Sequence, residues 1–241
     1  MFERMNSPFA KSTEVPVSNS ALSKNFVSNV FSLMFIALGI SGVTAFWFAS
    51  SGMINNLFTQ TGMSVLGWVI MLSPLALVLL MGAAFRKLSA MTLMTIFIVY
   101  SLLTGMSLSF IFVVYSVGSI TSTFFITAGT FGAMAALGYT TSTDLTKFGS
   151  LLYMALFGII IASVVNWFLG SSGLDYIISI AGVLIFTGLT AYDVQKIKRI
   201  GAGTDYDGET RQKLVIMGAL TLYLDFINLF LFMLRLFGGR N

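Results

Sequence analysis

The sequence predicts an all-α integral membrane protein with seven transmembrane helices. Of its 241 residues, 56% are hydrophobic and only 9% are charged, whereas a soluble domain carries about 25% charged residues. So few charges cannot cover a water-facing surface, which places the chain in a bilayer. Two further observations support seven helices: the number of long apolar windows, and the placement of the basic residues between them.

Each predicted helix is an apolar window of the length that a bilayer requires, about 20 residues. The windows cover residues 26–50, 62–85, 89–115, 118–139, 148–170, 174–197 and 214–237. In chain order they are separated by the polar segments SSGMINN, RKLSA, SVGS, TTSTDLTK, GSSGLD and KRIGAGTDYDGETRQK. We expect residues 1–24 to be a polar cytoplasmic tail without a cleavable signal peptide, and residues 25–241 to be one transmembrane domain.

Two local features bear on the shape and packing of individual predicted helices. Pro74 lies inside the second window, where it should kink the helix or leave a carbonyl without its usual donor. Small residues recur at packing spacing in the fourth and fifth windows, and such positions let helix backbones approach closely in lipid. These residues are Ala128, Gly132, Ala136, Gly158 and Ala162.

The basic residues predict the orientation of the chain. If seven helices alternate, one side collects Arg4, Lys11, Lys24, Arg86, Lys87, Lys147, Lys196, Lys198, Arg199, Arg211 and Lys213. The opposite side has no lysine or arginine before Arg235 and Arg240. Since cytoplasmic loops carry the excess of basic residues, we expect a cytoplasmic N-terminus and an external C-terminus. Six or eight helices would break this pattern.

The chain contains neither cysteine nor histidine. Disulfides, thiol chemistry and histidine-dependent pH switches are therefore excluded. Rhomboid-type serine proteases and zinc site-two proteases need histidine, so both are excluded as well. We expect no catalytic residue, no cofactor and no nucleic-acid partner.

Asp225 lies within the seventh window, about 16 Å from its start at 1.5 Å per residue. Thr221 and Asn228 share its helix face at spacings of four and three residues, which makes a narrow polar stripe. An intramembrane carboxylate costs at least ~2.5 kcal/mol and is a functional candidate by default. The alternative is a protonated side chain that only hydrogen-bonds a neighbouring helix.

Asp193 lies near the cytoplasmic end of the sixth window, with Thr190 one turn before it. On its own it could equally be an end residue that reaches water and pairs with Lys196. Because the sixth and seventh helices are consecutive and antiparallel, their polar stripes could face each other in one pocket. Two partly desolvated carboxylates at close range would then share a proton and sense pH.

Carboxylate oxygens also suit a hard cation such as calcium. Asp193 and Asp225 alone form an incomplete shell, so binding would be weak and transient, as permeation requires. A basic residue at the same depth could close the pocket by pairing with Asp193. Arg86 is the first candidate and Lys87 the second, and for both the alternative role is a positively charged membrane anchor.

The segments GLTAYDVQKIKR and MGALTLYLDFINLFLFMLRLFGGR, which carry these carboxylates, closely resemble the bacterial branch of the transmembrane Bax-inhibitor-motif family. The resemblance covers about residues 24–238 and includes LTGMSLSFIFVVYS and FGAMAALGYTTSTDL. It implies six helices around a central C-terminal helix, in the bacterial inner membrane. It also implies a pH-sensitive calcium leak in which the aspartates matching Asp193 and Asp225 share a proton and the arginine at the position of Arg86 latches one of them.

One departure from that family concerns the second helix. Some calcium-leaking members carry a glutamate there, whereas GWVIMLSPLALVLLMGAAF has no acidic residue. Two other functions compete with the leak. The first is a non-conducting regulator that binds a membrane-bound quality-control protease. The second is an intramembrane aspartyl protease, which is disfavoured because the required Gly-x-Gly-Asp and Pro-Ala-Leu motifs are absent.

Overall fold

The computed structural model describes residues 19–60, 62–203 and 206–239. Its long helices are α1 (Asn19–Ser50), α2 (Val65–Ala83), α3 (Ala90–Leu108), α5 (Val117–Thr140), α6 (Thr146–Leu169), α7 (Ser172–Gly201) and α8 (Gly208–Phe237). The short elements are η1 (Met53–Leu57), β1 (Phe58–Thr59), β2 (Gly62–Met63) and α4 (Ile111–Val114). Within the described residues, seven helical segments are long and apolar enough to cross a membrane, the third being α3 continued by α4. The predicted all-α fold with seven spans is confirmed.

The boundaries differ from the predicted windows where polar residues extend a helix beyond its apolar part. Helix α8 begins at Gly208 rather than at residue 214, because the Asp207 side chain caps it by accepting a hydrogen bond from the Thr210 amide at 2.6 Å. Helix α1 begins at Asn19, so residues 19–24 of the predicted tail are helical. Residues 1–18 of that tail, with Arg4 and Lys11, lie outside the described residues, as does Arg240.

Serine hydroxyls satisfy the first amides of four membrane helices. Each serine stands directly before its helix and accepts from the amide three residues later. The pairs are Ser64 with Gly67, Ser89 with Thr92, Ser116 with Ser119, and Ser171 with Leu174. Because an unpaired amide is costly at a membrane helix end, these caps explain where the helices begin.

Helix α2 continues through Pro74 without a break. Proline has no N–H to donate to the carbonyl of Ile70, four residues earlier. The hydroxyl of Ser73 donates to that carbonyl instead, at 3.0 Å. As predicted, Pro74 leaves a carbonyl, that of Ile70, without its usual amide donor. The Ser73 hydroxyl replaces that donor.

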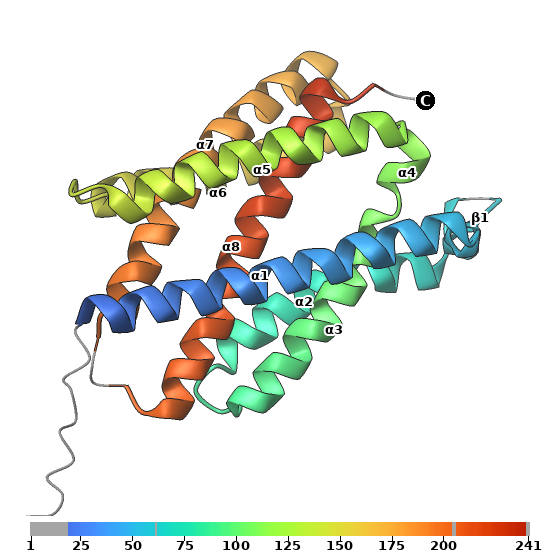
Figure 1. Ribbon diagram of the computed structural model, residues 1–241. Coiled ribbons are helices and arrows are strands. Elements are labelled where there is room, and N and C mark those ends of the chain that lie inside the picture. The colour runs from blue at the N-terminus through green and yellow to red at the C-terminus, as the bar shows by residue number, and fades with distance from the viewer. Residues whose placement is uncertain (1–18, 61, 204–205, 240–241) are drawn as a thin grey trace, which may run out of the picture.

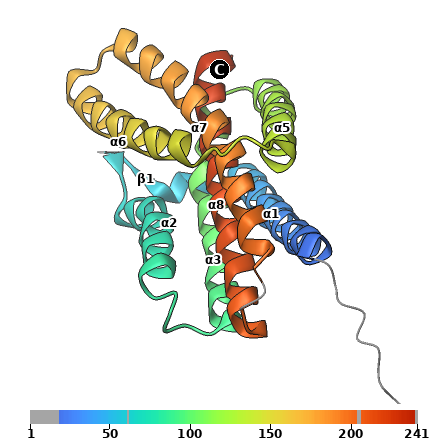
Figure 2. The ribbon, with the colours of Figure 1, turned by 90° about the vertical axis from the view of Figure 1, so that its left-hand side faces the viewer.

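The helices form two groups of three that α8 connects (Figure 1). Helices α1, α2 and α3 pack together in one group, and α5, α6 and α7 in the other. Helix α8 packs against α1 and α3 of the first group and against α5 and α7 of the second. Helices α2 and α6 lie further out, packed on α3 and α7 (Figure 2). The C-terminal helix is thus central, but four helices rather than six supply its main contacts.

Close helix contacts form at glycines that the spacing argument did not select. A Cβ atom on Gly138 of α5 would overlap the Ala191 carbonyl of α7, and one on Gly105 of α3 would meet the Ser41 carbonyl of α1 at 2.6 Å. By contrast, no atom lies within 4 Å of a Cβ added to Gly132 or Gly158. The prediction that these two glycines serve close packing was wrong, because spacing identifies a helix face and not the neighbour that the face meets.

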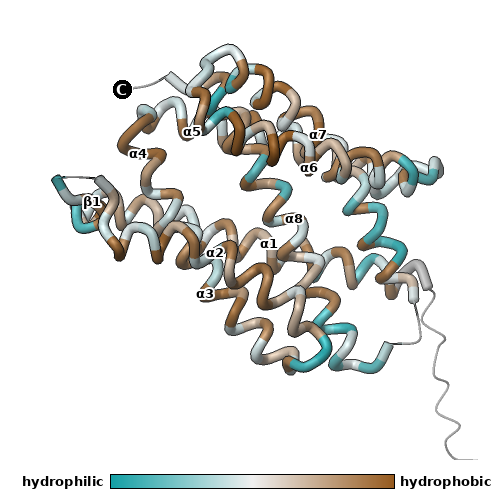
Figure 3. Tube along the Cα trace, turned by 180° about the vertical axis from the view of Figure 1, so that it is seen from behind, coloured by the Kyte–Doolittle hydropathy of each residue, from teal (hydrophilic) through white to brown (hydrophobic). Residues whose placement is uncertain are grey.

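The ends of the helices that carry most basic residues come together. The Ser23 hydroxyl of α1 donates to the Lys198 carbonyl of α7 at 2.9 Å, and the Arg211 side chain of α8 donates to the Leu22 carbonyl at 2.9 Å. The start of α3 meets the start of α8, where the Ala90 amide donates to Glu209 at 3.4 Å. Figure 3 shows hydrophilic residues at such helix ends and hydrophobic residues along the helices between them. We call this region the basic end; its cytoplasmic location stays a prediction.

Candidate functional site

Asp193 of α7 and Asp225 of α8 meet inside the helix bundle. The two residues are 1% and 5% exposed, respectively, and their carboxyl groups lie close enough to act on each other. Ionised carboxylates only accept hydrogen bonds, so two of them can bond each other only when one carries a proton. The Oδ2 atom of Asp225 is buried and has no hydrogen-bond partner among the described residues. The site thus places two carboxyl groups together in the interior and leaves one of their oxygens unpaired.

Tyr153 of α6 is a third member of the site. Its hydroxyl lies 3.3 Å from Oδ1 and 3.2 Å from Oδ2 of Asp193 and donates to that carboxyl group. The Tyr153 ring packs edge-on against Tyr192, the residue before Asp193, with centroids 6.0 Å apart. Sequence reasoning missed Tyr153, because a single tyrosine in an apolar helix gives no pattern that links it to a residue on another helix.

A cavity of about 510 Å³ lies between α6, α7 and α8 and reaches Asp225. Thr221 and Asn228, the predicted polar neighbours of Asp225, line it together with Tyr153 and Ser163. The remaining walls are apolar side chains such as Leu224 and Phe232. Asp225 is thus the ionisable group on the wall of a largely apolar space, as in many ligand and ion pathways.

The predicted polar side chains divide into two sets. Thr221 and Asn228 border the cavity. Each donates a hydrogen bond within α8: Thr221 to the Met217 carbonyl at 3.0 Å, and Asn228 to the Leu224 carbonyl at 2.8 Å. Thr190 is completely buried and donates to the Phe186 carbonyl at 2.8 Å, and it does not line this cavity.

The basic candidates lie apart from the aspartates. Arg86 and Lys87 are exposed in the turn after α2, and neither forms an ion pair with any described residue. Lys196 is the basic residue that acts electrostatically on Asp193, but the two do not form an ion pair, and the Lys196 ammonium lies 5.9 Å from the Tyr192 ring centre. With 1% exposure, Asp193 does not reach water as an end residue would.

A model of the family described as inhibitor of apoptosis-promoting Bax1 matches residues 23–241. The chain belongs to the Bax inhibitor family. This confirms the resemblance drawn from the two aspartate-bearing segments.

This Bax inhibitor family chain is similar to the following three bacterial proteins. An uncharacterized protein of Borreliella burgdorferi is 48% identical over 91% of this chain and 94% of its own length. The inner membrane protein YbhL of Escherichia coli is 44% identical over 90% of this chain and 93% of its own. An uncharacterized membrane protein of Streptococcus pyogenes is 35% identical, with coverage of 90% and 93%. With its seven apolar helices, the chain is a multi-pass protein of the bacterial inner membrane.

At the basic end, a polar network ties α7 of this Bax inhibitor family protein to the α5–α6 connection. Arg199 donates to Asp144 at 2.7 Å and to the Thr146 hydroxyl at 3.0 Å. Gln195, two residues after Asp193, accepts from the Leu145 amide at 2.9 Å and donates to the Thr143 carbonyl at 2.8 Å. The connection is thereby held against α7 close to the aspartate pair.

Asp144 anchors that network as a carboxylate. Hydrogen bonds from the side chain and amide of Thr146, and then from Arg199, hold the pKa of Asp144 well below its ordinary value. Asp144 therefore stays ionised near neutral pH and keeps its hydrogen bonds from Thr146 and Arg199.

The site offers only part of a metal shell. Within the described residues there is no group of three or more histidine, cysteine or acidic side chains that could hold a metal ion. Calcium takes six to eight oxygen ligands, so Asp193 and Asp225 would need water and carbonyl oxygens to complete a shell. Such a site suits brief contact with a passing cation better than storage.

Proposed function

We propose that this protein is a pH-sensitive cation leak that passes calcium and is gated by the Asp193–Asp225 pair. The observation that carries this proposal is the contact between two buried carboxyl groups from consecutive helices, one of which borders a cavity. Burial and a shared proton make the pair sensitive to pH, and its negative charge attracts cations.

The gating step follows from electrostatics. With one proton between them, the two carboxyl groups attract each other and hold α7 against α8. When the proton leaves, two like charges face each other in a medium of low dielectric constant and repel. Separation of α7 from α8 would then connect the cavity beside Asp225 with the basic end.

A latch is the second part of the proposal. Arg86, with Lys87 as its rival, would pair with Asp193 once α2 and α7 approach each other. Both side chains are exposed and unpaired with any described residue, so neither would have to break an ion pair first. Such a pair would close the pocket by neutralising Asp193.

The test is calcium flux into liposomes that contain the purified protein, between about pH 6 and about pH 8, where a proton-sharing carboxyl pair can titrate. We expect the wild-type flux to change several-fold across this range. Asp193→Asn and Asp225→Asn should each flatten the response, because an amide cannot lose the shared proton. Asp175→Asn is the matched control, since Asp175 is paired with Arg235 at the opposite end of α7, at 3.5 Å.

The same preparation separates the competing functions. If the wild-type protein passes no cation at any pH, the leak function is refuted. The function that remains is a non-conducting regulator of a membrane-bound protease. Cleavage of a transmembrane peptide that disappears in both asparagine variants would instead indicate an aspartyl protease. Flux that responds to pH equally in wild type and both variants would contradict gating by the pair while keeping the leak.

A further inference from the structure

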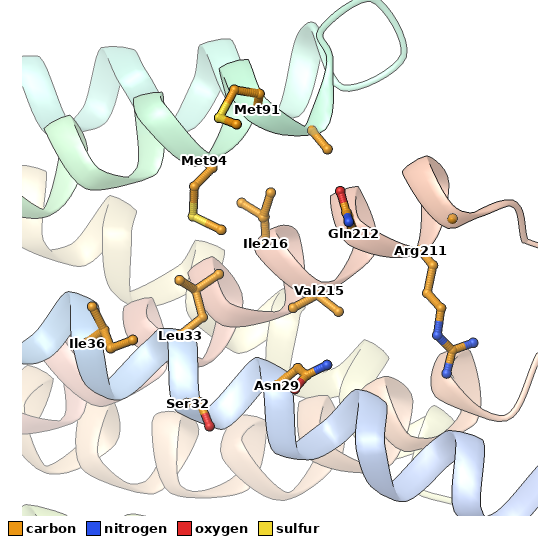
Figure 4. Close-up of a pocket in the computed structure, with 12 residues that line it drawn as sticks. Asn29, Ser32, Leu33, Ile36, Met91, Met94, Arg211, Gln212, Val215 and Ile216 are labelled. Carbon is orange, nitrogen blue, oxygen red and sulfur yellow. The ribbon is translucent and has the colours of Figure 1, made fainter.

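A second cavity lies at the basic end, between α1, α3 and α8, on the other side of α8 from the aspartate pair. Its volume is about 640 Å³, within the range of small-molecule sites. Apolar side chains from all three helices point toward one another across it (Figure 4). These are Leu33 and Ile36 from α1, Met91 and Met94 from α3, and Val215 and Ile216 from α8. We call this cavity the α1–α3–α8 groove.

The groove opens at the surface of the molecule. Two of its apolar side chains remain largely exposed, Ile36 at 59% and Met91 at 76%. Flexible methionine side chains adapt their shape to an apolar guest. A hydrocarbon chain from the bilayer can therefore enter the groove from the side.

One end of the groove is polar. Asn29, Arg211 and Gln212 line it, and Arg211 and Gln212 lie at the start of α8, beyond the apolar side chains (Figure 4). The Arg211 guanidinium is held by the carbonyls of Leu22 and Gly201, at 2.9 and 3.4 Å, and lies 5.3 Å from the Phe26 ring centre. These contacts fix its position without neutralising its charge.

The positive charge of Arg211 is uncompensated within the described residues. No ion pair joins it to a carboxylate there. The acidic side chain of the same turn, Glu209, is paired with Lys213 at 3.6 Å and accepts from the Ala90 amide. Both hydrogen bonds of Arg211 come from Nη2, which leaves the other donors of its five N–H groups for a ligand.

We propose that the α1–α3–α8 groove binds an anionic phospholipid, with an acyl chain between the methionines and the phosphate near Arg211, at the polar end. The occupant follows from charge complementarity and from the place of the groove. An apolar slot that opens sideways to lipid takes an acyl chain, and a positive group at its end selects an acidic headgroup. Arginine also matches the geometry of a phosphate through paired N–H donors.

The experiment is native mass spectrometry of the full-length protein from micelles with equal amounts of phosphatidylglycerol and phosphatidylcholine. We expect the wild type to retain phosphatidylglycerol preferentially. Arg211→Gln should retain about five-fold less of it, the factor expected for one basic residue at a membrane surface. Lys87→Gln is the matched control, because it removes the same charge at the same end and Lys87 does not line the groove.

Two further variants keep the proposal open to refutation. Met94→Trp fills the groove and should reduce retention of both lipids. Gln212→Glu adds a negative charge at the polar end and leaves the carbonyl contacts of Arg211 in place, so it tests the headgroup site even if Arg211→Gln fails to fold. Equal retention of the two lipids by the wild type would refute the proposal, as would wild-type retention in a folded Arg211→Gln or in Gln212→Glu.

Discussion

Two carboxyl groups buried beside each other inside a membrane protein are costly unless a proton neutralises one of them. Asp193 and Asp225 stand in this relation, and Tyr153 adds a donor to Asp193 from a third helix. The three side chains come from α7, α8 and α6. Under the proposed gating, a change in the protonation of the pair would act on the packing of all three helices.

The Tyr153 hydrogen bond can be tested by a double-mutant cycle. Interhelical hydrogen bonds in membranes average about 0.6 kcal/mol. We expect Tyr153→Phe to lower the free energy of unfolding by about that amount, and to have a smaller effect in the Asp193→Asn background, since the two side chains share one interaction. Reversible unfolding in mixed micelles measures both.

The control is Tyr176→Phe. Tyr176 is 61% exposed and has no hydrogen bond among the described residues, so its substitution should leave stability unchanged. Equal losses from Tyr153→Phe in the wild-type and Asp193→Asn backgrounds would mean that the hydroxyl does not depend on Asp193.

Single charges in apolar windows are visible in a sequence, whereas their partners are not. Asp225 and Asp193 could be selected because a carboxylate in a membrane helix is costly. Asp193 remained ambiguous until its 1% exposure and its contact with Asp225 were known. The sequence did not indicate that Tyr153 contacts Asp193, because tyrosine is tolerated at many positions of a membrane helix.

At the scale of elements, the helices follow from hydrophobic length and from their caps. Serines before four helices and Asp207 before α8 satisfy the first amides, and Ser73 replaces the donor that Pro74 lacks. These are local effects, so the apolar windows predicted all seven helices. The packing of one helix on another depended instead on which glycines face a neighbour.

Gly138 is the clearest packing position. Gly138→Ala should destabilise the protein by about 1–3 kcal/mol, the usual cost of overpacking, because its methyl group would overlap the backbone of α7 at Ala191. Gly132→Ala, in the same helix, is the matched control, because no atom lies within 4 Å of its added methyl group. Thermal unfolding in detergent distinguishes them, and similar melting temperatures for the two variants would show that α5 does not pack on α7 in this way.

For the whole molecule, α8 is the main connection between two helix groups, which also meet where α1 packs on α7. One of its faces carries Asp225 toward α6 and α7, and another carries Tyr223, whose hydroxyl bonds Ser41 of α1 at 2.6 Å. The start of α8 carries Arg211 at the α1–α3–α8 groove. A movement of α8 would therefore affect the aspartate pair and the groove together.

The orientation of the molecule can be measured with introduced cysteines, because the chain has none of its own. From the positive-inside rule, we expect Lys87→Cys to be labelled by a membrane-impermeant maleimide only after spheroplasts are permeabilised. Met53→Cys, in the η1 segment that joins α1 to α2, should be labelled in intact spheroplasts, as its side chain is 41% exposed. The cysteine-free wild type supplies the background, and the reverse labelling pattern would invert the predicted topology.

By itself, the sequence determined the class of the protein, its seven spans, the alternating placement of its basic residues and the two costly carboxylates. These properties depend on the transfer of each segment between water and lipid, which is local and adds up along the chain. Only the tertiary structure decided that Asp193 meets Asp225, that Tyr153 joins them, and that α1, α3 and α8 enclose a groove beside Arg211. Contacts between helices in lipid lack a hydrophobic driving force that could mark them in the sequence, so they emerge only from how the helices pack.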